Sequence, residues 1–266
     1  MKILHSADWH LDAPFVGRTA AQTRQLKENL LKVPQLLAEL CRREGCDLVL
    51  LAGDLFDGPW SRESFRALYA ALEEMAVPVF ISPGNHDFVT HESPYLSEKW
   101  PENVHIFTRP EMESVALEGL DCRIYGAGYR SMDCDGLLED FHAEGQERYH
   151  VAVLHGDPAQ ANSPYCPVTS AQIKSSGLNY LALGHIHKAG QLKAGQTLCA
   201  WPGCPMGRGF DELETKGAMI VTVEDTVRTT FVPLATLRFY DLDVTPGIDA
   251  YRALAAVLPA MGAENF

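Results

Sequence analysis

Residues 47–54 read DLVLLAGD, a run of apolar side chains that ends in a glycine and an aspartate. An apolar run of this length, bounded by turn residues, is typical of a strand buried on both faces of a parallel sheet. Ligand-binding loops of α/β sheets gather at the carboxyl ends of the strands. Asp54, which directly follows this strand, is therefore a candidate site residue.

The chain on both sides of this strand alternates short apolar segments with amphipathic ones. Residues 2–6 and 78–82 predict strands, and residues 24–43 predict a helix because their apolar side chains recur at helical spacing. Pro34 should bend this helix or divide it into two pieces, and Ser61 can cap the next helix. The alternation predicts an α/β fold. Further strands are expected at residues 123–125, 149–154 and 180–183.

The pattern changes after Gly217, where three apolar segments follow one another without helices between them. Such a series predicts antiparallel strands added to a mixed sheet. A short helix is expected near Tyr251. We place a boundary between a domain over residues 1–243 and a C-terminal tail over residues 244–266. The three apolar segments are residues 218–223, 227–232 and 239–244.

Acidic residues outnumber basic ones by 35 to 22, which gives the chain a net charge of −13. The hydrophobic share of 46% is ordinary for a globular protein and excludes a disordered or collagen-like chain. The acid excess excludes a basic surface over the whole molecule of the kind that binds nucleic acid. Any contact with DNA therefore has to be local and sensitive to salt.

The seven cysteines are odd in number and form no CxxC motif, which predicts reduced thiols rather than a disulfide framework. The first residues, Met1 to Leu4 followed by polar His5 and Ser6, do not form a secretory signal. No apolar run approaches the roughly 18 residues needed to span a bilayer. We therefore expect a cytoplasmic protein without a membrane partner.

Five short polar segments each stand where a predicted strand ends, so they could converge on one crevice. Taken singly, each has an ordinary interpretation, because Gly-Asp and Gly-Asn pairs form turns and a lone histidine after a strand is often a core residue. Together they contain five of the ten histidines. In extended backbone, residues i and i+2 point to the same side, which would let each such pair share a metal ion. The segments are Asp8-Trp9-His10, Gly53-Asp54, Gly84-Asn85-His86-Asp87, His155-Gly156 and Gly184-His185-Ile186-His187.

The order of these segments (DxH, GD, GNHD, H, GHxH) resembles the calcineurin-like metallophosphoesterase superfamily over roughly residues 1–240. Residues 3–11, 53–57 and 183–188 look like the SbcD branch of DNA-repair exonucleases, particularly its YhaO-like members, and so do Trp201-Pro202-Gly203 and Lys216-Gly217-Ala218. The resemblance implies a four-layer α/β/β/α sandwich, in which two packed mixed β-sheets are flanked by helices.

The resemblance also implies a site with two divalent metal ions. Mn²⁺ is the expected ion, because carboxylate, amide oxygen and imidazole together favour a borderline-hard cation over thiolate-bound zinc. By similarity to the family, Asp54 bridges the two ions. The first ion is completed by Asp8, His10 and His187, and the second by Asn85, His155 and His185.

The catalytic roles that follow from the resemblance fall on the residues after Asn85. His86 would contact the scissile phosphate and protonate the leaving oxygen, a general-acid role that suits imidazole. Asp87 would orient His86. Asp57 is a further loop carboxylate that could support the site, although some family members carry histidine at that position.

The function implied by the resemblance is hydrolysis of DNA phosphodiester bonds, as a Mn²⁺-dependent exo- or endonuclease in DNA repair. Arg18, Lys188 and Arg208 flank the site segments and are candidate substrate contacts; Arg24, Lys27, Arg62 and Arg66 are further candidates. The family implies an SMC-like ATPase partner of the SbcC type and a capping domain that helps to place DNA. The chain ends where a cap would begin, so we expect weak DNA binding by this chain alone.

Two other functions fit the sequence less well. The same motifs occur in phosphodiesterases that act on cyclic nucleotides or other small substrates, and only the finer SbcD-like features disfavour that interpretation. A non-catalytic scaffold on the same fold is disfavoured because all seven ligand positions are filled. Homodimerisation through helices is also expected from the family; Phe65, Tyr69 and Leu72 could serve it, although they suit core packing better.

Overall fold

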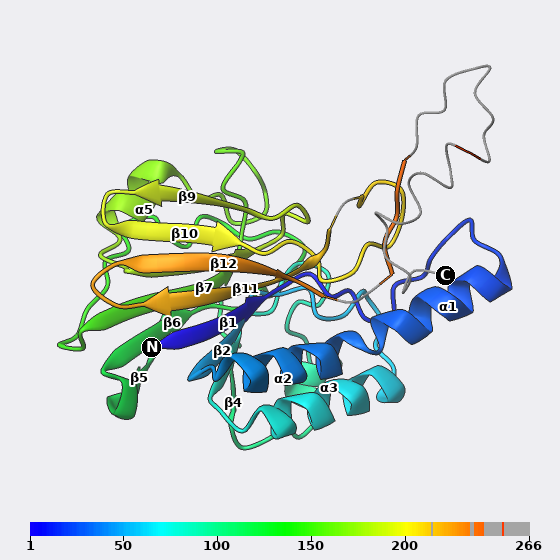
Figure 1. Ribbon diagram of the computed structural model, residues 1–266. Helices are drawn as coiled ribbons and strands as arrows, with labels where there is room; N and C mark the ends of the chain where they lie inside the picture. The colour runs from blue at the N-terminus through cyan, green and yellow to red at the C-terminus, as the bar shows by residue number, and fades with distance from the viewer. Residues whose placement is uncertain (214, 235–236, 242–251, 253–266) are drawn as a thin grey trace.

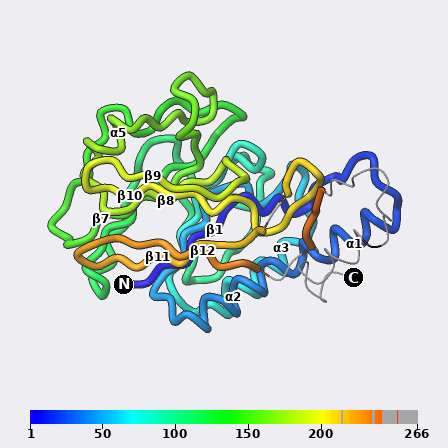
Figure 2. The backbone as a smooth tube through the Cα atoms, turned by 45° about the horizontal axis from the view of Figure 1, so that its top comes forward, coloured from blue at the N-terminus to red at the C-terminus, as the bar shows by residue number. Residues whose placement is uncertain are grey.

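The computed structural model describes residues 1–213, 215–234, 237–241 and 252. Two six-stranded sheets pack face to face, with the long helices on the outer face of one sheet and a short helix on the outer face of the other (Figure 1). The tube view shows these layers one above another (Figure 2). The predicted α/β fold with two packed mixed sheets flanked by helices is confirmed.

The first sheet has the order β12-β11-β1-β2-β3-β4. Strands β1 to β4 run parallel to one another, whereas β11 lies antiparallel to β1 and β12 antiparallel to β11. The two antiparallel additions predicted after Gly217 are therefore confirmed. The strands are β1 (Lys2–Ser6), β2 (Leu48–Leu51), β3 (Val79–Ile81), β4 (Val104–Ile106), β11 (Gly217–Val223) and β12 (Val227–Pro233).

The second sheet has the order β5-β6-β7-β8-β10-β9. Its four central strands are parallel, and the edge strands β5 and β9 run antiparallel to their neighbours. These edge strands are not predictable from hydrophobic runs, because exposed side chains alternate with partly buried ones along both of them and only Ala194 at the end of β9 is buried. The strands are β5 (Glu113–Leu117), β6 (Cys122–Gly126), β7 (Tyr149–His155), β8 (Tyr180–Gly184), β9 (Gly190–Ala194) and β10 (Thr197–Trp201).

The predicted helix at residues 24–43 is two helices, α1 (Ala20–Leu30) and α2 (Val33–Glu44). Pro34 lies in the first turn of α2, where the missing amide hydrogen leaves no hydrogen bond unmade. Ser61 caps α3 (Arg62–Met75) as predicted, because its side chain accepts from the amide of Ser64 at 3.1 Å. The other helices are α4 (Pro94–Ser97), α5 (Ser170–Ser175) and the 3₁₀ turn η1 (Glu118–Leu120).

Three apolar clusters hold the layers together. One lies between the two sheets, a second lies between the first sheet and helices α1 to α3, and the third lies under α5. Phe65 and Leu72 belong to the second cluster and are 7% and 0% exposed. These two side chains therefore serve core packing, and only Tyr69 of the predicted dimer residues is partly accessible.

His5 connects the two sheets through side-chain hydrogen bonds. From β1 its ring reaches the β8 residues Tyr180, with 2.8 Å between Nδ1 and the hydroxyl, and Leu183, with 3.1 Å between Nε2 and the carbonyl oxygen. A carbonyl can only accept, so Nε2 carries the hydrogen and Nδ1 accepts from Tyr180. This neutral tautomer is fully buried, and burial lowers the pKa of His5 to about 3.

The folded protein should therefore lose stability in mild acid through His5. Below pH 6.5 the unfolded chain protonates this histidine while the folded protein does not, so the free energy of unfolding falls by about 2 kcal/mol from pH 7 to pH 5. A His5→Gln variant lacks this contribution. Urea unfolding at both pH values should show the variant losing less stability than the parent protein; equal losses would contradict a neutral, buried His5.

The structure describes only part of the C-terminal region for which a strand, a boundary and a helix were predicted, and in that part the strand prediction is wrong. Residues 239–241 of the predicted strand over residues 239–244 are not in a strand. The rest of that segment, the boundary near residue 243 and the body of the helix expected near Tyr251 lie outside the described residues.

All seven cysteines are free thiols. None of the described helices combines the length and hydropathy that a membrane span requires.

Candidate active site

The five polar segments converge at one edge of the sandwich, at the carboxyl ends of β1, β2 and β3 in one sheet and of β7 and β8 in the other. Backbone hydrogen bonds join the first two loops, because the amides of Asp8 and His10 donate to Gly53 and Asp54 at 3.0 and 2.9 Å. The amide of His185 donates across the sheets to Asp8 Oδ1 at 2.9 Å. The predicted crevice is thus formed from both sheets.

The backbone at this edge is not extended, contrary to the expectation from the i, i+2 spacing. Asp8, His10 and Asp54 have φ values of 55°, 49° and 51°, and His185 has 88°. Left-handed conformations are uncommon for residues with a side chain and tend to cluster at functional sites. Both members of the Asp8/His10 pair and one member of the His185/His187 pair thus have left-handed backbone at this edge.

Glycines in the loops allow the close approach of the ligand candidates. A side chain on Gly84 would collide with the carboxylate of Asp54, and one on Gly53 would come within 2.5 Å of His155 Nδ1. Gly53 also has a φ of 86°, which favours glycine. The Gly-Asp and Gly-Asn pairs are therefore required by packing around the site as well as by the turns.

The first group of possible ligands consists of Asp8, His10 and His187. Their ligand atoms lie within 4.8 Å of one another, and the Nε2 atoms of the two histidines are 3.2 Å apart. Nδ1 of His187 lies 2.7 Å from Glu212 Oε1. An ionised carboxylate can only accept, so Nδ1 carries the hydrogen and Nε2 keeps its lone pair directed into the group.

The second group lies on the other side of Asp54. The Oδ2 atom of Asp54 is 3.3 Å from His155 Nε2 and 3.8 Å from His10 Nε2, so this carboxylate stands between the two groups. Asn85 Oδ1 lies 3.0 Å from His155 Nε2. The ring of His185 packs edge-on against His155, with 5.3 Å between centroids. All seven predicted ligand residues are therefore brought together.

The environment of these side chains suits divalent cations. Asp8 Oδ2 is buried and has no hydrogen-bond partner among the described residues, and an unpaired buried carboxylate oxygen is costly unless a cation satisfies it. Burial lowers the pKa of His10 to about 3 and that of His185 to about 4, which keeps both imidazoles neutral. Neutral imidazoles and carboxylates are the forms that bind metal.

His155 shows how strongly the carboxylates act on their neighbours. Burial opposes its positive charge, but Asp54 and then Asp8 outweigh burial and raise the pKa of His155 to about 10. A cation placed between these groups would take over the role of that proton. The electrostatics and the orphaned oxygen of Asp8 both fit the two-ion site that the sequence predicts.

His86 stands at the mouth of the site and is the most accessible of the site histidines. Its side chain is 41% exposed, and its ring packs edge-on against that of His10, with 4.8 Å between centroids. The backbone amide of His86 donates to Asp54 Oδ1 at 2.9 Å. Nδ1 lies 2.8 Å from Asp57 Oδ1, and this hydrogen bond raises the pKa of His86.

The expectation that Asp87 orients His86 is wrong, since Asp57 is the carboxylate that contacts the ring. Asp87 is buried and points to the loop after β2, where its Oδ2 accepts from the amides of Leu55 at 2.7 Å and Phe56 at 3.2 Å. It also accepts from the hydroxyl of Tyr95. Asp87 therefore holds two loops together, and the oxygen that orients His86 comes from the other loop.

Glu212 is a site residue that the sequence analysis missed. It is 5% exposed, accepts from His187, and is bound by the guanidinium of Arg208, whose Nη2 lies 2.6 Å from Oε1. Arg208 also approaches Asp57, with 3.6 Å between Nη1 and Oδ2. The loop over residues 202–216 carries several acids, and no local pattern distinguishes the one that folds back onto His187.

The three predicted substrate contacts have different surroundings. Arg208 lies within the site, although its guanidinium already pairs with Glu212 and Asp57. Arg18 stacks on Phe210 and Phe239, with its guanidinium carbon 5.5 and 5.6 Å from the ring centroids. Lys188 is exposed and directly follows His187.

Comparisons with known proteins agree with this geometry. The family model described as calcineurin-like phosphoesterase matches residues 1–189. A Bacillus subtilis protein named uncharacterized metallophosphoesterase YhaO is 34% identical over 244 residues, which cover 84% of this chain and 57% of that protein. A Staphylococcus epidermidis protein whose name makes it part of the nuclease SbcCD is 24% identical over 93% of this chain and 72% of its own length. The chain thus spans little more than half of the Bacillus relative.

Solved structures agree on the fold. A dimetal phosphatase from Danio rerio superposes with a TM-score of 0.57 at 12% sequence identity and covers 86% of this chain and 98% of its own. At this identity the likeness concerns the architecture alone. The two-sheet sandwich is therefore shared with proteins whose sequences have diverged widely from this one.

Proposed function

The chain belongs to the calcineurin-like phosphoesterase family, and from that premise we propose that it is a two-metal phosphodiesterase that cleaves DNA. The observation that carries the proposal is the position of His86. This histidine is half exposed and held by Asp57 beside two adjoining groups of metal ligands. A phosphodiester that rests on those groups would present its leaving oxygen to His86.

The ligands of the two ions follow the assignment that the sequence suggested. Asp8, His10 and His187 would hold one ion, Asn85, His155 and His185 the other, and Asp54 both. The mixture of oxygen and imidazole donors favours Mn²⁺. When bound, a pair of such ions lowers the pKa of a water molecule and neutralises charge on a phosphate.

The protein's own groups supply the remaining chemistry. The imidazole of His86 can hold a proton on Nε2 while Asp57 accepts from Nδ1, so the ring is aimed before substrate arrives. Buried Glu212, paired with the partly exposed Arg208, fixes the ring of His187. Asp87 holds the loops that carry Asp54 and His86 against each other.

DNA as the substrate is supported by the name of the Staphylococcus relative, part of a nuclease, and by the SbcD-like stretches of the sequence. The net charge of −13 confines any DNA contact to local cations. We further propose a partnership with an ATPase of the SbcC type and a role in DNA repair. A cytoplasmic location is part of the same proposal, since all seven cysteines are free thiols.

The proposal is tested by incubating the protein with Mn²⁺ and three substrates: end-labelled DNA, a cyclic nucleotide and bis(p-nitrophenyl) phosphate. We expect degradation of the DNA and hydrolysis of the aryl ester. Turnover of the cyclic nucleotide without DNA degradation would replace the nuclease with a small-substrate phosphodiesterase. Mn²⁺ binding without turnover of any of the three would indicate a scaffold.

Glu212 should influence metal affinity without being a ligand of the two proposed ions. A Glu212→Gln variant removes the charge that fixes His187 and leaves the guanidinium of Arg208 without its closest partner. We expect Mn²⁺ affinity to fall by about 10- to 100-fold, which is typical when a carboxylate behind a metal-binding histidine is removed. Calorimetric titration measures this decrease, and the exposed neighbour Asp211 offers the control variant Asp211→Asn. Equal Mn²⁺ affinity in the Glu212→Gln variant and the parent protein would show that Glu212 does not support His187.

A further inference from the structure

A pocket of about 450 Å³ opens directly beside His86. This volume lies within the roughly 300–1,000 Å³ of sites that hold small molecules. Aromatic side chains form much of its wall, and the loops after β2 and β3, which also carry site residues, supply them. The pocket is lined by Phe56, Trp60, His86, Phe88 and Pro94, among others.

The ring of Trp60 is fixed in this wall. Its indole nitrogen donates to the carbonyl oxygen of Glu92 at 3.0 Å, and its ring packs against Phe65 with 5.8 Å between centroids. Behind it, Phe65 contacts Trp100, and Trp100 stacks on Tyr95 with an interplanar angle of 10°. The hydroxyl of Tyr95 is bound to Asp87. The wall is therefore rigidly connected to the loop of His86.

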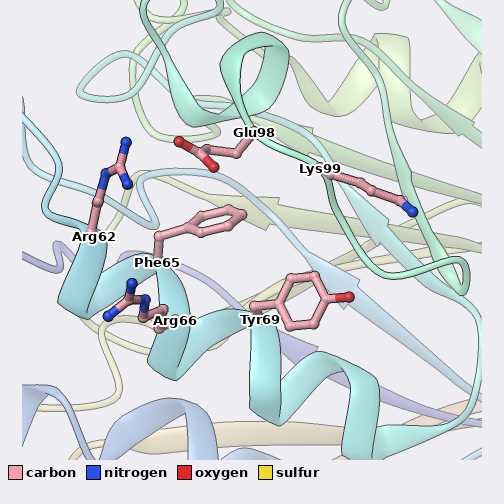
Figure 3. A pocket seen from close by; sticks show the side chains of 6 residues that line it. All are labelled: Arg62, Phe65, Arg66, Tyr69, Glu98 and Lys99. Carbon is pink, nitrogen blue, oxygen red and sulfur yellow. The ribbon is translucent and has the colours of Figure 1, made fainter.

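A second pocket, of about 310 Å³, is lined by Phe65, whose ring packs against Trp60 of the first pocket. Three of its six lining residues are cationic: Arg62 and Arg66 project from α3, and Lys99 comes from the opposite segment, with its side chain directed away from the two arginines (Figure 3). Within the part of the chain that the structure describes, none of these three side chains forms an ion pair. Phe65 and Tyr69 form its floor, and Glu98 is its one acidic side chain.

We propose that these two pockets bind the leaving strand of a single-stranded nucleic acid. The pocket beside His86 receives the base of the nucleoside whose oxygen leaves, and the cationic pocket takes a phosphate further along the same strand. The base of the departing nucleoside is assigned to the pocket beside His86 because His86 is the group proposed to protonate the leaving oxygen of that nucleoside. The inference rests on the proposed phosphodiesterase function.

The chemistry of the walls selects this ligand. Aromatic faces bind bases of any sequence by stacking, and the energy of that contact is largely independent of which base is present. A base inside the pocket cannot be paired, so the substrate has to be single-stranded or frayed at that position. Arginine and lysine next to the stacking surface match the phosphate that follows each base.

Dinucleoside monophosphates test the pocket, because each contains a single bond that can be cleaved. Three substrates are cleaved in the presence of Mn²⁺ and compared. One carries both bases, and each of the other two lacks one of the bases. The leaving nucleoside is the one released without phosphate. We expect removal of its base to lower kcat/KM by about tenfold or more, while removal of the other base has a smaller effect.

Variants of the pocket wall test whether the dependence of kcat/KM on the leaving base arises in the pocket beside His86. In Trp60→Leu and in Phe88→Leu, the dependence of kcat/KM on the leaving base should shrink until substrates with and without that base are cleaved alike. Tyr149→Leu, which changes an aromatic residue at the start of β7, should keep the full dependence. A dependence that is absent from the parent protein, or that survives both pocket variants, would overturn the inference. Failure to cleave any dinucleotide or oligonucleotide would instead count against the nuclease function.

A binding measurement separates the two proposals further. The indole N–H signal of Trp60, identified by its disappearance in Trp60→Leu, should shift when the free nucleoside is added, whether or not the protein cleaves DNA. The same sugar without a base should leave the signal in place. No shift at saturating nucleoside would contradict the base pocket even in an active nuclease.

The cationic pocket has its own readout. A double variant with Arg62→Gln and Arg66→Gln should bind a single-stranded oligonucleotide more weakly and with a smaller salt dependence, by roughly 0.7 in the logarithmic slope for each phosphate that is no longer bound. An unchanged salt dependence of binding would show that this pocket does not bind a phosphate of the strand.

Discussion

An Asp54→Ala variant is expected to bind neither metal ion, with an affinity for Mn²⁺ lowered by more than about 100-fold. Asp54 Oδ2 lies between His155 and His10 at 3.3 and 3.8 Å, so one carboxylate serves both groups of ligands. Its other oxygen accepts from the amide of His86. Removing the carboxylate therefore disrupts both groups and the loop that carries the proposed acid.

Elemental analysis after dialysis measures the decrease, together with calorimetric titration of Mn²⁺. Asp47→Ala is the matched control, because Asp47 lies at the opposite end of the same strand and accepts from the amide of Lys2 at 2.6 Å. A circular dichroism spectrum establishes that each variant is folded. Full occupancy in a folded Asp54→Ala protein is the result that rules out a bridging role.

A His86→Ala variant is expected to keep both metal ions while its rate of DNA hydrolysis falls by about 10²- to 10⁴-fold, the range for a general acid. His86 lies close enough to His10 and Asp54 to form a possible metal-binding group with them, but its side chain is 41% exposed and its Nδ1 is already hydrogen-bonded to Asp57, so we assign it to the leaving oxygen rather than to a metal ion. The decrease should be smaller for bis(p-nitrophenyl) phosphate, because nitrophenolate leaves readily without a proton.

The comparison requires metal content and kcat for both substrates, with His91→Ala as an exposed control five residues along the same loop. An Asp57→Asn variant should reproduce part of the effect, because it weakens the hydrogen bond that aims the ring. If metal content falls together with activity in His86→Ala, His86 is a ligand rather than the acid.

The sequence was sufficient to predict the strands that position the site and the convergence of all seven ligand candidates. The reason is physical: buried parallel strands such as residues 48–51 are continuous apolar runs, and the polar residue that follows each one stands at the edge where loops meet. What joins Asp8 to His185, or Asp54 to His155, is the packing of one sheet on the other, which the family resemblance implied.

Contacts that depend on loop conformation were not predictable from spacing. Asp87 is adjacent to His86 in sequence yet turns away from it, whereas Asp57 reaches His86 from another loop. Glu212 comes from an irregular segment whose fold is decided by burial against His187 and Arg208. The left-handed backbone at Asp8 and His10 likewise results from tertiary contacts that override the local preference for extended chain.

The construction of the site from both sheets has a consequence for how the protein matures. His10 and its partner His187 are separated by 177 residues, and at ordinary rates of protein synthesis that interval takes about 10 to 35 s. During this time the newly made first half carries two carboxylates that have not yet met the second sheet. The proposed catalytic centre therefore cannot form before the second sheet has been made as far as β8, and a nascent chain that ends before His187 lacks one of the proposed ligands.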